Sequence, residues 1–219
     1  MAASKLLTLN MSAPGERGYA SLASPNLDAL RRLEGARIDF GFSEEARQAR
    51  AVAEARFARL GCSAVVHGDV HLRNVLLRAD RSSYLIDYGQ SGPGHPAIDL
   101  VRLELALYLG VFKQTDAEEE GRRLQRVLSL DRGDWDAISS CFPRQVASVT
   151  NRVCLEGCAL ARDAAIEAVT AHGGTQQDYV ATKYLLAWQS LIIEGLNTAL
   201  ARGIIDVLSN EITSWAEEA

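Results

Sequence analysis

The sequence of 219 residues contains few lysines and no long apolar run. Lysine occurs only as Lys5, Lys113 and Lys183, and the 28 acidic residues outnumber the 23 basic ones, which leaves a net charge of −5. This balance argues against a protein that binds nucleic acid or anionic membranes, because both require a basic surface. No apolar run approaches the roughly 18 residues of a membrane span, and the N-terminus lacks the pattern of a signal peptide. The sequence therefore predicts a soluble, cytoplasmic protein.

Cysteine is also scarce, and no CxxC pair occurs. The four cysteines are Cys62, Cys141, Cys154 and Cys158. Without a secretory context they are expected to be reduced thiols. Cys154 and Cys158 lie one helical turn apart and could share a metal, but the favoured interpretation is that they fill a helix face as small apolar residues.

Two short stretches combine polar side chains suited to chemistry with apolar neighbours: HGDVHLRN from His67 to Asn74 and YLIDYG from Tyr84 to Gly89. Apolar, β-prone runs flank the first stretch, so its polar groups are expected in a turn between short strands. The run NVLLRADRSSYLID predicts a hairpin whose turn lies around residues 79–83, where Asp and Ser favour a turn. A hairpin of this length returns Asp87 to the side of Asn74.

Three side chains with oxygen atoms follow one another in these stretches: Asp69, Asn74 and Asp87. Carboxylate and amide oxygens at one end of a hairpin suit Mg²⁺ and a phosphate better than a soft metal. The sequence therefore predicts that this site carries the chemistry of the chain.

The same residues resemble a known family. HGDxHxxN, followed by a strand and by I-D-Y-G, is similar to the catalytic and metal-binding segments of the aminoglycoside phosphotransferase and choline kinase-like families, small-molecule relatives of protein kinases. The resemblance implies that Asp69 accepts the proton of a substrate hydroxyl, and that Asn74 and Asp87 hold Mg²⁺ against the phosphates of ATP. GPGHPAIDLVRLE resembles the segment in which this family braces the catalytic loop with an aspartate, here Asp99.

Other interpretations of these residues stay open. His67, Asp69 and His71 alternate, so on a strand they could chelate Zn²⁺ or Mn²⁺, as in metal-dependent hydrolases. His67 alone is expected to be structural, and His71 either braces the loop or contacts substrate. Asp99 could cap the helix that follows it.

The rest of the chain predicts a mostly helical α+β protein. We expect a loop or short strand over residues 1–24 and a phosphotransferase lobe over 25–219, with its catalytic segment at 64–104 and a helical subdomain at 105–219. The expected helices cover residues 25–35, 44–60, 99–112, 117–130, 134–141, 143–171, 175–202 and 205–217, with loops at 90–96 and 173–174. The apolar stripe of the helix over 99–112 is expected to consist of Leu100, Leu103, Leu107 and Val111.

The chain departs from the resembled family at its N-terminus. Members of that family carry an N-terminal lobe with a Gly-rich turn and a lysine that together grip ATP. Only Lys5 precedes His67, and the early glycines form no Gly-rich loop. By this resemblance the ATP-gripping lobe is absent. The chain would then be a fragment, a subunit completed by another chain, or an inactive module that binds a partner.

The function expected from these residues is Mg²⁺-assisted phosphoryl transfer from ATP or another nucleoside triphosphate to a hydroxyl of a small molecule. Acidic residues of the helical region could meet a cationic substrate, and the sequence does not choose among Glu104, Glu156, Asp163 and Glu194. A protein partner or a second copy of the chain is expected on the surface that the absent lobe would cover.

Overall fold

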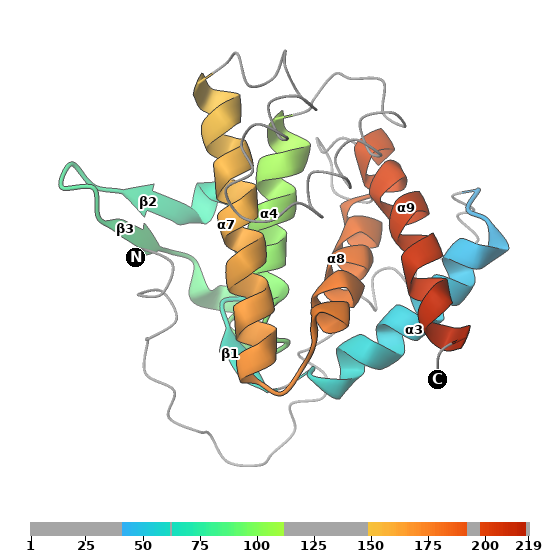
Figure 1. The fold of residues 1–219 in the computed structure, drawn as a ribbon. Coiled ribbons are helices and arrows are strands. Elements are labelled where there is room, and N and C mark those ends of the chain that lie inside the picture. Colours follow the sequence, from blue (N-terminus) through green and yellow to red (C-terminus); the bar gives the residue numbers. More distant parts are fainter. Residues whose placement is uncertain (1–40, 62, 112–148, 192–197, 218–219) are drawn as a thin grey trace.

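The computed structural model describes residues 41–61, 63–111, 149–191 and 198–217. Its helices are α3 (Glu44–Arg59), α4 (Ile98–Val111), α7 (Val149–Ala171), α8 (Gln176–Ser190) and α9 (Thr198–Glu217). The short strands are β1 (Ala64–Val66), β2 (Val75–Leu77), β3 (Ser83–Leu85) and β4 (Gly92–Gly94). The prediction of a mostly helical α+β protein is confirmed (Figure 1). The helices predicted over 25–35, 117–130 and 134–141 lie outside the described residues.

The core lies where α4 and α8 meet the other helices. α4 packs against α7 and α8, and α3 packs against α8 and α9, as Figure 1 shows. α8 is the most enclosed element, because almost all of its side chains from Asp178 to Ser190 are buried. None of the helices in the described ranges combines the length and the apolarity that a bilayer span requires.

α3 begins and ends where its sequence predicts. The Ser43 side chain accepts a hydrogen bond from the Ala46 N–H at 3.2 Å, and Glu44 and Glu45 place negative charge in the first turn. Both features stabilise the N-terminus of a helix. The helix gives way to a turn at Leu60 and Gly61.

Two predictions about the other helices are wrong. The buried stripe of α4 is one position away from the expected leucines and consists of Val101, Glu104, Leu105, Tyr108 and Leu109. The predicted boundary between the last two helices, near Arg202, is also misplaced, because α9 runs without a break from Thr198 to Glu217. Apolar residues surround much of α4, so its sequence pattern does not select one face.

Strand β4 lies within the stretch predicted as a loop. It pairs antiparallel with β1, with Ala64 opposite Gly94 and Val66 opposite Gly92. A Cβ atom on Gly94 would lie 2.6 Å from Cγ2 of Val66, so only glycine allows this close pairing. The pairing brings the chain after β1 beside the chain before β4.

The predicted hairpin is present. β2 and β3 pair antiparallel, with Val75 opposite Leu85 and Leu77 opposite Ser83. At its tip the Asp80 carboxylate accepts hydrogen bonds from the N–H and the hydroxyl of Ser82. The hairpin extends away from the helices, as Figure 1 shows.

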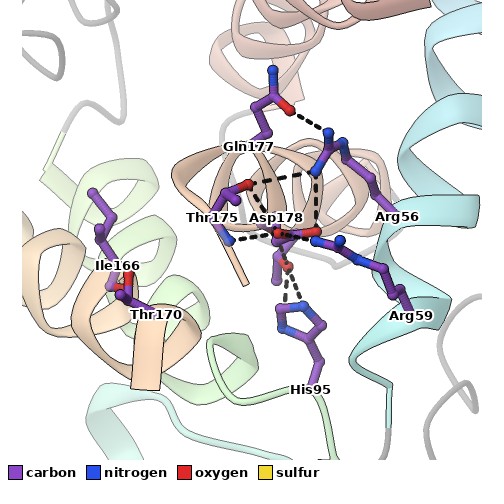
Figure 2. Close-up of polar contacts among 9 residues, drawn as sticks. Arg56, Arg59, His95, Ile166, Thr170, Thr175, Gln177 and Asp178 are labelled. Carbon is purple, nitrogen blue, oxygen red and sulfur yellow. Dashed lines mark hydrogen bonds and ion pairs between the residues drawn. The ribbon is translucent and has the colours of Figure 1, made fainter. Parts of the chain in front are cut away.

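A buried carboxylate joins α3 to α8. Asp178 accepts hydrogen bonds from Arg59 at 2.6 Å and from Arg56 at 3.3 Å, and it also bonds the N–H of Thr175 at the start of α8 (Figure 2). Burial alone would raise the pKa of Asp178, but the hydrogen bonds from Thr175 and Arg59 outweigh it and hold the pKa below its ordinary value. The ion pairs therefore stabilise the contact between the two helices while the carboxylate is ionised.

His95 is buried beside this cluster. Its ring stacks on Phe57 with a centroid distance of 4.7 Å, and the Thr182 hydroxyl lies 3.3 Å from Nδ1. Burial lowers the pKa of His95 to about 4, although Asp178 acts in the opposite direction. His95 is therefore neutral in the folded protein at pH 7.

We predict that His95 makes the fold sensitive to mild acid. Below pH 6.5, its ordinary pKa, the unfolded chain binds a proton at His95, whereas the folded chain does so only near pH 4. The free energy of unfolding should therefore fall as the pH decreases through this window, by up to about 3 kcal/mol. Urea unfolding at pH 7.5 and pH 4.5 measures this difference. His95→Gln should show a smaller difference, and an equal one would contradict the assignment.

Candidate functional site

The polar loop between β1 and β2, residues 67–74, lies at the base of the hairpin. It ends in a short 3₁₀ helix, η2 (Leu72–Asn74), and leads directly into β2. Beyond β3, the Ile86 N–H donates to the Asn74 carbonyl at 3.0 Å. Because Asp87 follows Ile86, the returning strand places it beside Asn74, as the sequence predicts.

Asp99, in the first turn of α4, holds the start of the polar loop. Its carboxylate accepts hydrogen bonds from the N–H of His67 at 2.6 Å and from the N–H of Gly68 at 2.9 Å. Burial raises the pKa of Asp99, while these two hydrogen bonds and the charge of Arg102 lower it in part. The geometry is that of a brace between helix and loop, the role that the resemblance assigns to Asp99.

The loop also lies tightly against the chain that follows the hairpin. Gly68 has a φ of 81°, and a Cβ atom there would lie 2.4 Å from the Gln90 carbonyl oxygen. The Ser91 hydroxyl donates to the carbonyl of His67 at 3.2 Å. Only glycine fits at position 68, because a side chain would meet both the strained φ and the backbone of Gln90.

Both ring nitrogens of His67 are bonded to the backbone. Nε2 lies 2.9 Å from the Ile86 carbonyl, and Nδ1 accepts from the Asp69 N–H at 3.3 Å. Since a carbonyl oxygen can only accept, Nε2 carries the proton and the ring is neutral. His67 therefore ties the polar loop to the end of β3 and has no lone pair left for a metal.

Asp69 and Asn74 lie in contact. The Asn74 side-chain nitrogen donates to the Asp69 carbonyl at 3.0 Å and lies 3.5 Å from Oδ2 of the same residue. His71 Nε2 lies 3.7 Å from Oδ2, and His71 Nδ1 accepts from the Arg73 N–H. His71 thus both caps η2 and flanks the Asp69 carboxylate.

Asp87 adopts a backbone conformation that is rare for residues other than glycine. Its φ is 64° and its ψ is 61°, the left-handed region, which costs about 1 kcal/mol or more for a residue with a Cβ atom. Asp87 precedes a second 3₁₀ helix, η3 (Tyr88–Gln90), but its carboxylate makes no capping hydrogen bond there. Strained backbone of this kind is typical of functional sites.

Arg102 lies beside the polar loop, although no motif in the sequence marks it. Its guanidinium donates to the Gly68 carbonyl and lies 3.8 Å from Oδ1 of Asp69. Arg102 and Asp99 are three positions apart and therefore share one face of α4. This helical spacing is the signal in the sequence that could have identified it.

The residues that the sequence predicts as cation ligands offer oxygen atoms. Asn74 directs its nitrogen toward Asp69, which leaves its amide oxygen as an acceptor, and Asp87 has a carboxylate. Within the described ranges, no group of three or more His, Cys, Asp and Glu side chains could hold a metal. Mg²⁺ often binds through only one or two carboxylates and keeps several waters, so Asn74 and Asp87 are the residues here that could hold it.

The acidic residues considered for substrate binding occupy different environments. Glu104 is fully buried and bonds Lys183 at 2.8 Å and the Tyr179 hydroxyl at 2.9 Å, so it is part of the core. Asp163 pairs with Arg162 at 3.1 Å, Glu156 lies half-buried on α7, and Glu194 is outside the described residues. The hydrogen bonds of Glu104 and the ion pair of Asp163 with Arg162 join helix residues and do not involve the polar loop.

Cys154 and Cys158 are free thiols on α7. Cys158 is buried, and burial raises the pKa of both thiols, most strongly that of Cys158. Their environment is that of packing residues, as the sequence analysis favours.

Comparison with known proteins identifies the family. The family model described as Ternary complex associated domain 9 matches residues 42–185. The chain belongs to this family. No curated protein and no solved structure matches it. The match includes α3, the polar loop, the hairpin, α4, α7 and most of α8.

Membership in Ternary complex associated domain 9 corrects the family prediction from the sequence. The resemblance to the aminoglycoside phosphotransferase and choline kinase-like families predicts a different family, and that prediction is wrong. The assignment of the chain to the C-terminal lobe of that family is wrong with it, and the expected absence of an ATP-gripping lobe loses its basis. Short motifs around a turn describe local geometry, which does not by itself define a family.

We predict that Asp99→Asn loosens the polar loop. An amide has one accepting oxygen in place of two and no charge, so one of the two backbone N–H groups loses its partner, at a cost of about 1–3 kcal/mol. Amide hydrogen exchange should accelerate at His67 and Gly68. Asp80→Asn is the matched control, because Asp80 also accepts a backbone N–H but lies exposed at the hairpin tip. Unchanged exchange at both amides would contradict the bracing role.

Proposed function

We propose that the polar loop is a Mg²⁺-dependent site that transfers a phosphoryl group from a nucleoside triphosphate to a hydroxyl of a small molecule. The observation that carries the proposal is the contact between Asp69 and Asn74, whose backbone carbonyl accepts the N–H of Ile86, the residue before Asp87. These residues come from two separate stretches, and the backbone at Asp87 is strained.

Asn74 and Asp87 would hold the cation, which neutralises charge on the phosphates when it is bound. Asp69 would orient the acceptor hydroxyl and take its proton. The hydroxyl oxygen forms a bond to the terminal phosphorus, the bond from that phosphorus to the bridging oxygen breaks, and the nucleoside diphosphate leaves with the electron pair. Such a reaction needs mainly positioning and electrostatic stabilisation from the protein.

The loop is suited to positioning because its backbone is held from several sides. Asp99 binds its first two N–H groups, His67 ties it to Ile86, and Gly68 lies against Gln90. A carboxylate on such a loop keeps its direction without help from the substrate, which reduces the entropic cost of reaching the reactive geometry.

We predict that substitutions at the two aspartates separate binding from transfer. Asp87→Asn removes a charged ligand of the cation, so calorimetric titration with a non-hydrolysable ATP analogue and Mg²⁺ should show affinity lowered by at least about tenfold. Asp69→Asn should still bind the analogue, yet in a screen of hydroxyl acceptors with labelled ATP its transfer rate should fall by a factor of about 100 or more.

Asp80→Asn is the control for both measurements, because it makes the same chemical change at the exposed hairpin tip. Binding that does not depend on Mg²⁺, or native affinity in Asp87→Asn, would rule out the proposed cation ligands. A native transfer rate in Asp69→Asn would rule out its role toward the hydroxyl.

A second candidate function is association with a protein partner. The hairpin surface, defined as six exposed apolar side chains, is the observation that favours it: Leu72, Leu76, Leu77, Tyr84, Ile86 and Tyr88. Leu77 is 78% exposed, and a two-stranded hairpin of this kind is marginally stable unless its apolar side chains are covered. The family description, which names a ternary complex, is compatible with such a partner.

We predict that Leu77→Glu disrupts this association without unfolding the protein, because the side chain is exposed. A partner isolated with the native chain should, once purified, bind Leu77→Glu at least about tenfold more weakly, as expected for a charge placed in an apolar contact. Leu160→Glu is the matched control on α7, where Leu160 is 45% exposed. Sedimentation of the native chain and both variants tests whether a second copy is the partner. Equal binding of all three proteins would exclude the hairpin surface.

A further inference from the structure

Two charged residues of α4 hold the same segment of the polar loop. Asp99 accepts the N–H groups of His67 and Gly68, and Arg102 donates to the Gly68 carbonyl. Gly68 therefore has both its N–H and its carbonyl bonded to one helix face. The next residue in the chain is Asp69, whose carboxylate lies within reach of Arg102.

The Asp69 carboxylate has different neighbours at its two oxygens. Oδ1 lies 3.8 Å from the Arg102 guanidinium, while Oδ2 lies 3.5 Å from the Asn74 nitrogen and 3.7 Å from His71 Nε2. A cation that bound Asp69 directly would compete with the fixed positive charge of Arg102. Asp87, in contrast, has no ion pair with a basic residue among the described residues.

The position of Arg102 lowers the stability of the folded protein. Its side chain is only 13% exposed, and its second terminal nitrogen, Nη2, is buried without a hydrogen-bond partner among the described residues. Burial lowers the pKa of Arg102, although Asp99 and Asp69 act in the opposite direction. A buried guanidinium with an unsatisfied donor reduces stability, so its position beside Asp69 calls for a role at the site.

We infer that Arg102 is a positioning residue that keeps Asp69 out of the cation's coordination sphere. Asn74 and Asp87 then hold the cation, and Asp69 remains directed toward the acceptor hydroxyl. This inference rests on the proposed function and deepens it, because it divides the two aspartates of one site into a ligand and a base.

The test uses Mn²⁺ as the probe and the electron paramagnetic resonance of free Mn²⁺ as the readout, so no acceptor is needed. Arg102→Gln removes the charge but keeps a side-chain donor for the Gly68 carbonyl. Asp69 should then become available to the cation, and Mn²⁺ should bind about tenfold more tightly. A purely structural role for Arg102 predicts the opposite, because a loosened loop would bind the cation more weakly.

Arg73→Gln is the matched control. Arg73 lies exposed in the same loop, so this variant makes the same change in net charge near the site. Its affinity for Mn²⁺ should stay within about twofold of the native value, because an exposed charge is screened by solvent. An equal increase in Mn²⁺ affinity in Arg102→Gln and Arg73→Gln would overturn the inference, since it would show only the effect of the changed net charge.

Asp69→Asn in the native background tests the inference even if Arg102→Gln does not fold. If Arg102 excludes Asp69 from the cation, this variant should bind Mn²⁺ within about twofold of the native chain. A tenfold loss would show that Asp69 is already a ligand and would overturn the inference alone. Absence of Mn²⁺ binding in the native chain would instead overturn the proposed function, and this inference with it.

Discussion

The polar loop depends on one interaction, the pair of hydrogen bonds that Asp99 accepts from His67 and Gly68. These bonds join a loop with little apolar content to a helix that is packed in the core. Hydrogen bonds to an ionised carboxylate are stronger than neutral ones, at about 1.5–3 kcal/mol each. Contacts with α7 and α8 hold α4 in place. The hydrogen bonds to Asp99 therefore also restrain the loop. Asp69 and Asn74 then have defined positions.

Buried polar groups connect the helices that support this arrangement. Asp178 joins α3 to α8 through Arg56 and Arg59, and Glu104 joins α4 to α8 through Lys183 and Tyr179. Buried ion pairs add little net stability compared with apolar contacts, but an unpaired partner would be very unfavourable. Each pair therefore favours one relative placement of its two helices. The site is built on α4, which one of these pairs fixes directly.

The family description and the side chains of the polar loop favour different candidate functions. Ternary complex associated domain 9 replaces the family that the motifs resemble, and its description is compatible with a protein partner. In the polar loop Asp69 and Asn74 lie in contact, and beyond the hairpin the backbone of Asp87 is in the left-handed region. Part of the exposed hairpin surface lies on β2 and β3, the strands that connect Asn74 to Asp87. A partner on the hairpin would thus lie close to the proposed site, which links the two candidate functions physically.

The sequence by itself determined the features that depend on neighbouring residues: the Ser43 cap, the hairpin, and the return of Asp87 to Asn74. Hydrogen-bonding side chains and β-prone runs act over a few positions, so a linear pattern records them. Only the tertiary structure decided which stripe of α4 is buried, that α9 continues past Arg202, and that β4 pairs with β1. It also decided that Arg102 lies beside Asp69 and that Glu104 is buried in the core. Contacts between distant segments choose among helix faces that the sequence leaves equivalent.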